Sequence, residues 1–498
     1  MLPPDESVLA REYLHPNGDI EKSTLTHIGQ HSDHCLVDWD GPDDPESPLN
    51  WSYWKKFFFT SEIFLLTIAI YMGGAIYGAG TVDLAQKFGV SEVAATVGIT
   101  TFVLGYAFGP MILSPISELA YVGRMPIYII TLAIFVILQV PTALTTNLGV
   151  VIFLRFLAGF IGSPVLATGG ASLADVYKPE DCGSIMGVWG VIGTGGPSLG
   201  PLLGGYAVQA KGWTWTIWIL MWAASLALVV LAFFLPETSA QALLYRRADR
   251  LRRLTGNQNL RTQAERDGQH ISIGDLAMTC LVRPLILGSR EPIIIAWNLY
   301  CSLLYAILYC WIESFGVVFI EQHGFTLGEN GLAFISLPVG GVVAFVLFLP
   351  YINRHLKPKF ANGTFTPEDR LPITMLGGIL LPISLFWFGW TADASIHWIS
   401  PMAAAALWMV SNYLMFMSGL SYLIDCYPRY VASVLAGNVV MRSTLGAVFP
   451  LFSNSFFHHL GVGPACSILG GVSVLMLPIP FLLYKYGPKL RSWSKYAD

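Results

Sequence analysis

Long apolar runs alternate with short polar segments along most of the chain. Runs long enough to cross the ~30 Å hydrocarbon core of a membrane as helices occur in the first half at about residues 57–79, 94–117, 126–142, 149–173, 183–206 and 214–236. A second set follows at about residues 293–320, 330–351, 371–391, 397–424, 431–455 and 463–485. This pattern predicts an all-α membrane protein with twelve transmembrane helices in two pseudo-symmetric six-helix bundles.

Composition agrees with that interpretation. The 498 residues are 54% hydrophobic and only 12% charged, whereas soluble proteins carry about 25% charged residues. A soluble fold of this length could not cover its surface, so the chain is expected to contact membrane lipid. Its net charge of −4 resides in loops and tails and does not point to a nucleic-acid partner.

The polar segments divide the chain into five parts. Residues 1–50 contain eleven Asp or Glu and two Lys or Arg, and are predicted to form a disordered cytoplasmic tail. The two bundles are placed at 51–236 and 291–486. A cytoplasmic linker, 237–290, joins them, and residues 487–498 are expected to form a cytoplasmic C-terminal tail.

Loop charge predicts the orientation. Short cytoplasmic loops carry an excess of Lys and Arg. With the N-terminus in the cytoplasm, the expected outer loops contain only Lys87 and Lys211. Both termini are therefore expected to be cytoplasmic. In the linker, YRRADRLRRL at 245–254 is interpreted either as a basic amphipathic helix on the membrane surface or as a solvated linker.

The two halves also resemble one another. LADVY at 173–177 returns as LIDCY at 423–427, and the Gly/Ala/Ser-rich helix that follows contains Pro201 in one half and Pro450 in the other. Parallel repeats of this kind are a plan of one large transporter class, with the substrate site between the repeats. We therefore expect a central cavity that opens alternately to the two sides.

One predicted span is unusually poor in helix-forming residues. The segment 190–205, GVIGTGGPSLGPLLGG, contains seven Gly and two Pro. Small residues on one face allow a neighbouring helix to approach closely, and buried neighbours can tolerate a proline bend. We interpret the segment as a packing surface and pivot against another span, expected to belong to the other half.

Four ionisable residues lie within predicted spans: Glu62, Arg155, Glu313 and Arg442. Facing lipid would be costly, so each is expected to face protein or a wet cavity. Glu313 is flanked by aromatic residues, and burial of a carboxyl favours its protonated form. It is therefore a candidate proton carrier. The alternative is a structural hydrogen bond that orients its helix.

The sequence allows two roles for each of the two arginines. Arg155 is interpreted either as part of proton transfer or as an interhelical brace. For Arg442 a brace is favoured, and a place in the cavity wall is the alternative.

Charged residues at the expected cytoplasmic ends of spans form a candidate inner gate: Glu118, Arg124, Asp175 and Asp425. Arg124 and Asp175 are expected to form an ion pair that closes the inner face in one conformation. An exposed pair is weak, about 0–1 kcal/mol, but a gate needs only a small bias between two states.

Aromatic residues concentrate in the seventh and tenth predicted spans, and the candidates for the substrate cavity are Tyr305, Tyr309, Trp311, Tyr413 and Phe416. A pocket of such rings with one carboxylate suits large, apolar and often cationic compounds.

Several longer stretches carry a family resemblance. They include VDWDGPDDPESPLNWSYWKK, FLRFLAGFIGSPVLATGGASLADVY, GGPSLGPLLGG, LPETS and MRSTLGAVFPLF. With them the chain resembles the major facilitator superfamily, and within it the fungal twelve-span drug:proton antiporters of the benomyl/methotrexate/fluconazole-resistance type. The resemblance implies a proton-driven exporter of lipophilic drugs in the plasma membrane, which works as a monomer without a cofactor.

Individual motifs carry over unevenly. Arg155 and Gly159 match the span 4 motif, whose arginine is implied in proton coupling. The span 5 antiporter motif, Gly-Pro-x-x-Gly-Gly, is matched by Gly196, Pro197 and Gly200, with Pro201 in place of its last glycine. Gly204 and Gly205 follow just beyond it. In the loop after span 2, Glu118 precedes the Gly123-Arg124 pair by five residues rather than three, so the gate geometry is expected to differ.

Two alternatives to drug export remain. One is a proton-coupled exporter of a natural compound, such as a polyamine or a secondary metabolite. The other is a membrane-embedded enzyme or sensor. The sequence contains no GxxxxGK[ST] nucleotide-binding motif, no CxxC pair and no His at metal spacing, so neither an ATP site nor a metal site is predicted.

Overall fold

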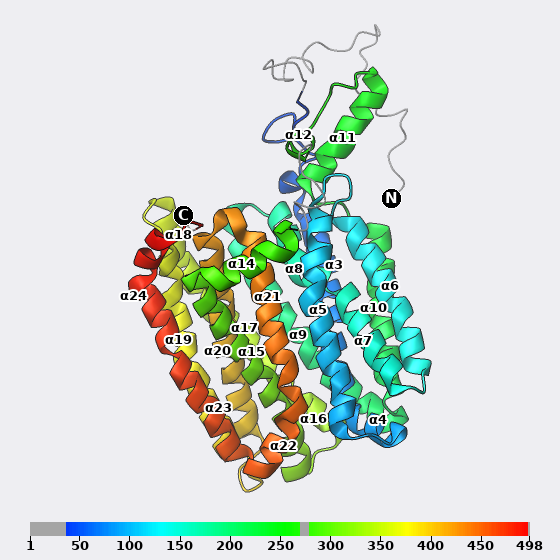
Figure 1. The fold of residues 1–498 in the computed structure, drawn as a ribbon, viewed down its shortest axis with the longest axis vertical. Coiled ribbons are helices and arrows are strands. Elements are labelled where there is room, and N and C mark those ends of the chain that lie inside the picture. The colour runs from blue at the N-terminus through cyan, green and yellow to red at the C-terminus, as the bar shows by residue number, and fades with distance from the viewer. Residues whose placement is uncertain (1–35, 269–277, 497–498) are drawn as a thin grey trace.

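A computed structural model describes residues 36–268 and 278–496. Its helices form two bundles that stand side by side, with one helical segment, α11 Ala240–Thr255, rising from one end (Figure 1). The chain crosses from the first bundle to the second through the segment that contains α11.

The N-terminal bundle follows the predicted apolar runs. Its helices are α3 Tyr53–Gly78, α4 Thr81–Phe88, α5 Glu92–Glu118, α6 Arg124–Leu144, α7 Leu148–Gly162, α8 Pro164–Val176, α9 Pro179–Lys211 and α10 Thr214–Phe234. α7 and α8 together form one span, divided at Ser163 because Pro164 has no N–H to continue the hydrogen-bond ladder.

The C-terminal bundle begins after α14 Arg283–Arg290. It contains α15 Pro292–Phe315, η3 Gly316–Gln322, α16 Leu327–Ala333, α17 Ser336–Tyr351, η4 Ile352–Leu356, α18 Lys357–Ala361, η5 Pro367–Arg370, α19 Leu371–Trp390, α20 Ile399–Cys426, α21 Val431–Val448, α22 Pro450–Leu460, α23 Val462–Met476 and α24 Pro478–Trp493. Pro450 and Pro478 divide the last two spans as Pro164 does in the first bundle.

The helices of the two bundles pair in the same order. In the first bundle α3 packs on α9, α5 on α7, and α6 on α10. In the second, α15 packs on α21, α17 on α20, and α19 on α23. Counted as spans, these are the pairs 1–5, 2–4 and 3–6 in both bundles, which confirms the predicted repeat.

Eleven helices of the described residues are long and apolar enough to cross a membrane, and α9 is not among them. Five of the eleven lie between Asp44 and Arg247, whose side chains form an ion pair at 2.7 Å. These two residues are therefore on the same side of the membrane, which requires an even number of crossings between them. The 33-residue α9, diluted by glycine and proline, supplies the missing crossing.

Residues 36–50 pack against α11 and against residues 260–261, just before α12 Gln263–Gly268, and we call this assembly the N-terminal clamp. Arg247 forms ion pairs with Asp40 and Asp44, and Arg250 with Glu46 at 3.1 Å. Beneath these pairs lies a small apolar cluster of Val37, Ala248 and Leu260. The clamp joins an acidic segment to a basic helix about 200 residues later in the sequence.

The clamp bears on two expectations. Residues 36–50 are ordered, whereas a disordered tail was expected over 1–50; residues 1–35 lie outside the described part of the chain. Of the two interpretations of the basic helix, the structure favours the linker, because α11 rises away from the bundle (Figure 1) and its Arg247 and Arg250 pair with carboxylates of residues 40–46. At the other terminus α24 continues to Trp493, so most of the expected C-terminal tail is helical.

Candidate transport cavity

A cavity of about 2030 Å³ lies between the two bundles. Side chains of α3, α5 and α9 line it from the N-terminal half, and those of α15, α20 and α21 from the C-terminal half. Ligand pockets for single drug-sized molecules usually measure about 300–1,000 Å³. This cavity is therefore large enough for one bulky compound or several smaller ones.

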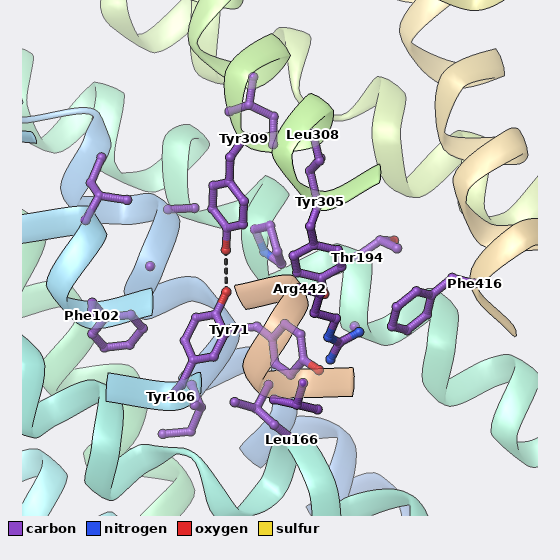
Figure 2. Close-up of a pocket in the computed structure, with 18 of the residues that line it drawn as sticks. Tyr71, Phe102, Tyr106, Leu166, Thr194, Tyr305, Leu308, Tyr309, Phe416 and Arg442 are labelled. Carbon is purple, nitrogen blue, oxygen red and sulfur yellow. Dashed lines mark hydrogen bonds between the residues drawn. The ribbon is translucent and has the colours of Figure 1, made fainter. Parts of the chain in front are cut away.

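Tyrosines from both halves meet in the middle of the cavity (Figure 2). The hydroxyl of Tyr106 on α5 is hydrogen-bonded to that of Tyr309 on α15 at 2.5 Å. Tyr71 on α3 and Tyr305 on α15 line the same region. The hydrogen bond between Tyr106 and Tyr309 links the two halves across the cavity.

Arg442 on α21 brings a positive charge into this region. Its Cζ lies 4.6 Å from the ring centroids of both Tyr305 and Phe416. The residue is only 6% exposed, and its Nε and Nη1 atoms have no hydrogen-bond partner. Arg442 thus braces α15 and α20, as expected, and also lines the cavity.

Glu313 also lines the cavity. It lies eight residues after Tyr305 on α15, which places it about 12 Å further along the helix axis. Its carboxylate forms no hydrogen bond or ion pair with any described residue. The α-helical hydrogen-bond pattern gives way to a π-helix three residues later, at Gly316, a change that is frequent at functional sites.

Four of the five predicted aromatic cavity residues line it, namely Tyr305, Tyr309, Tyr413 and Phe416. The prediction was wrong for Trp311, which is fully buried in the C-terminal bundle and stacks on Trp408 with ring centroids 4.8 Å apart. Residues on a helix turn by about 100° each, so Tyr305 and Tyr309 share a face and Trp311 points to the opposite one.

Arg155 on α7 is enclosed within the N-terminal half. It is fully buried, and its Cζ lies 4.6 Å and 4.3 Å from the ring centroids of Tyr77 and Phe102. Its Nε donates a hydrogen bond to the carbonyl of Gly98 at 3.2 Å. Arg155 does not line the cavity, so the structure does not bring it together with Glu313.

The predicted gate residues form two ion pairs, each within one half. Arg124 Nε lies 2.8 Å from Asp175 Oδ2 and joins the start of α6 to the end of α8. Asp425 pairs instead with Arg370, which joins η5 to the end of α20. The Arg124–Asp175 pair is the one expected from the sequence, and neither pair crosses between the halves. Glu118 is exposed at the end of α5 and lines the cavity.

A residue missed by the sequence interpretation lies beside this gate. Gly123 has a φ of +81°, and a Cβ there would lie 2.3 Å from Glu237 Oε2. Glu237 accepts hydrogen bonds from the amides of Arg124 and Met125 at 3.0 and 3.4 Å, so it caps the start of α6. It also pairs with Arg246 of α11 at 3.3 Å. Its partners on α6 precede it by about 113 residues, so no local signal revealed it.

The glycines of α9 approach helices of both halves. A Cβ at Gly196, Gly200 or Gly204 would lie 2.6–2.9 Å from atoms of α3, in the same half. A Cβ at Gly190 would lie 2.7 Å from Met417 on α20, and one at Gly205 would lie 2.3 Å from the carbonyl of Leu327 on α16, both in the other half. The expected seam with the other half is thus present at the two ends of the segment, and its middle packs within the first half. The two prolines of the motif line the cavity: Pro197 and Pro201.

A family model described as Major Facilitator Superfamily matches residues 63–450. The chain belongs to the major facilitator superfamily. Transporter mfs1 of Schizosaccharomyces pombe is 46% identical, with 93% of this chain and 88% of that protein covered. Fluconazole resistance protein 1 of Saccharomyces cerevisiae is 40% identical, with 94% and 86% covered. The structure of the proton:xylose symporter XylE shares the fold, with a TM-score of 0.59, 16% identity, and 88% and 96% covered.

These matches confirm the predicted fold and the resemblance to fungal drug-resistance transporters. As a member of the major facilitator superfamily, the protein is a multi-pass membrane transporter, and the alternative of a membrane-embedded enzyme is wrong. The cavity between the halves is accordingly the candidate transport site.

Proposed function

We propose that this protein is a proton-coupled antiporter that exports lipophilic drugs or xenobiotics by alternating access between its two halves. It works as a monomer in the plasma membrane, surrounded by lipid, with both termini in the cytoplasm and without a cofactor. The observation that carries the proposal is a large cavity between the halves, lined by aromatic rings and by the unpaired carboxylate of Glu313.

Packing between the halves supports the alternating-access part of the proposal. At the end of the bundles opposite α11, backbone meets backbone: a Cβ at Gly205 would lie 2.3 Å from the Leu327 carbonyl, and one at Gly331 2.5 Å from the Pro201 carbonyl. The cavity lining reaches Glu118 and Gln241 at the end that carries α11, and it also reaches Glu92 and His458 at the opposite end. The halves therefore meet closely beside a cavity that extends toward both ends, so that rocking one half against the other would change which end is open.

Glu313 is assigned as the proton carrier. Its carboxylate has no cationic partner among the described residues, so its charge changes when a proton binds and it is not held ionised by a fixed ion pair. It takes up a proton in the outward-facing state and releases it to the cytoplasm. Proton entry down its gradient then drives export of the lipophilic compound.

The test is efflux of a neutral lipophilic dye, Nile red, from cells that lack their own exporters, with and without a protonophore. Wild type is compared with Glu313→Gln and with Glu62→Gln. Glu62 is the matched acid: it is 2% exposed and both carboxylate oxygens lack partners, but it does not line the cavity.

We expect wild-type efflux to collapse with the proton gradient. Glu313→Gln is expected to lower efflux to the level of protonophore-treated cells, and Glu62→Gln to retain it. Loss of efflux in Glu62→Gln alone would transfer the carrier role to Glu62. Efflux that persists in the presence of protonophore would disprove proton coupling.

A further inference from the structure

Arg442 is a buried positive charge that borders the cavity among aromatic rings. It is 6% exposed, and Nε and Nη1 are buried without a hydrogen-bond partner. No carboxylate within the described residues forms an ion pair with it. Glu313 lies about 12 Å beyond Tyr305 along α15, too far to neutralise it directly.

The two aromatic contacts compensate for only part of the cost of burying this charge. Tyr305 and Phe416 each place a ring centroid 4.6 Å from Cζ of Arg442, and such cation–π contacts are favourable. Neither ring contact supplies a hydrogen-bond acceptor for the N–H groups of the guanidinium, which form the fork that matches a carboxylate. Two atoms of that fork, Nε and Nη1, have no hydrogen-bond partner.

The surroundings of Arg442 add further donors and space. Figure 2 shows the hydroxyl of Tyr71 beside the guanidinium of Arg442. In the internal repeat Pro201 corresponds to Pro450, 249 residues later. With the same offset, Gly193 of α9 is the position equivalent to Arg442 of α21. Gly193 also lines the cavity, and a Cβ there would meet no atom within 4 Å.

We propose that Arg442 and Tyr71 bind the anionic group of the cargo, so that the cavity selects lipophilic organic anions, carboxylates above all. The proposal rests on the export function described above and names its substrate class. It differs from the often cationic cargo expected from the sequence. An inside-negative membrane potential favours the outward movement of an anion, which agrees with an exporter.

Three pyrene derivatives with the same fluorophore test the proposal: pyrenebutyrate, pyrenebutanol and pyrenebutylamine. Equilibrium binding to the purified protein in lipid nanodiscs is measured by energy transfer from tryptophan to pyrene, with empty nanodiscs as the blank for lipid partitioning. We expect wild type to bind the carboxylate at least about tenfold more tightly than the amine, as for one charge-assisted contact.

Variants of Arg442 assign the preference to its guanidinium. Arg442→Gln is expected to weaken pyrenebutyrate binding about tenfold and pyrenebutanol binding by less than about twofold. Arg442→Lys keeps the charge but lacks the fork of N–H groups, so its affinity for pyrenebutyrate is expected to lie between those of wild type and Arg442→Gln. Arg155→Gln removes the other ring-flanked buried guanidinium, which does not line the cavity, and is expected to leave the ratio of carboxylate to alcohol affinity unchanged.

The proposal is overturned if wild type binds the amine as tightly as the carboxylate, if it binds none of the three, or if Arg442→Gln leaves the carboxylate-to-alcohol ratio unchanged. The wild-type comparison is decisive even if a variant fails to fold. Binding is measured without a proton gradient, so failure of the anion preference is distinguishable from failure of proton-driven Nile red export.

Discussion

Arg155 in the N-terminal half and Arg442 in the C-terminal half each lie between two aromatic rings, with ring centroids 4.3–4.6 Å from Cζ. Only Arg442 borders the cavity. The two are not repeat partners: in the shared pairing of helices, α7 corresponds to α20, and α21 corresponds to α9. The two halves share one arrangement of helices, but each carries its buried arginine on a different helix, and only one of the two arginines reaches the cavity.

The corresponding positions of α9 and α21 sharpen this contrast. Arg442 occupies the position that Gly193 takes in the first half. One wall of the cavity thus presents a guanidinium, and the equivalent wall presents open space. A symmetric scaffold has become an asymmetric site, in which charge and volume come from opposite halves.

The largest effect is expected when each arginine is replaced by the similarly sized Met. Arg155→Met removes a fully buried, largely unpaired charge and is expected to stabilise the fold by about 1–4 kcal/mol. Arg442→Met is expected to give a smaller gain, because Arg442 borders the cavity and is 6% exposed, whereas Arg155 is fully buried. Thermal unfolding of the purified variants measures the stability change of each. Equal gains would contradict the contrast between the two arginine sites.

A second contrast lies within α9, three residues apart. Gly196→Val places a Cβ 2.6 Å from the Tyr71 Cβ and is expected to destabilise the fold by about 1–3 kcal/mol through overpacking. Gly193→Val enters open space and should leave stability unchanged while weakening binding of bulky cargo. Denaturation midpoints and pyrenebutyrate affinity separate the two, and a stability loss in Gly193→Val would contradict the assignment of open space.

The two halves contain ion pairs at equivalent helix ends, Arg124–Asp175 and Arg370–Asp425. A double-mutant cycle with Asn and Gln replacements is expected to give a coupling energy of about 1 kcal/mol for each pair. Similar values would show that the repeat preserves these contacts. A coupling near zero in one half would mean that its pair is incidental.

The most local effect concerns the N-terminal clamp, which has no counterpart among the described residues of the second half. Burial alone would raise the pKa of Asp44, but hydrogen bonds from the Asp40 and Glu46 amides and from Arg247 outweigh it and lower that pKa. A lowered pKa stabilises the clamp above the unfolded value of about 4, and this contribution disappears as the pH falls through the folded value.

Hydrogen exchange of α11 amides in wild type and Asp44→Asn tests this expectation. Asp44→Asn is expected to weaken protection at pH 7 by about 1–3 kcal/mol. The difference between the two proteins should shrink below about pH 4. A difference independent of pH would mean that shape, and not charge, holds the clamp together.

Sequence patterns predicted the spans, the repeat and the cavity position of Glu313 because these depend on local hydrophobicity and helical periodicity. The spacing of Trp311 from Tyr309 already placed the two on opposite faces of one helix. Other features depend on contacts between distant segments. Glu237 reaches Arg124 across 113 residues, and which partner each face of α9 meets is decided only when the bundles assemble.

The clamp also has a consequence for the order of events during synthesis. Asp44 and its partner Arg247 are separated by 203 residues, and translation proceeds at about 5–20 residues per second. The acidic segment therefore waits roughly 10–40 s on the ribosomal side of the membrane before the basic helix emerges. By then the six hydrophobic segments of the first half have been synthesised. The clamp can form only if its two parts are on the same side of the membrane, and therefore only if the first half has been inserted with an even number of crossings.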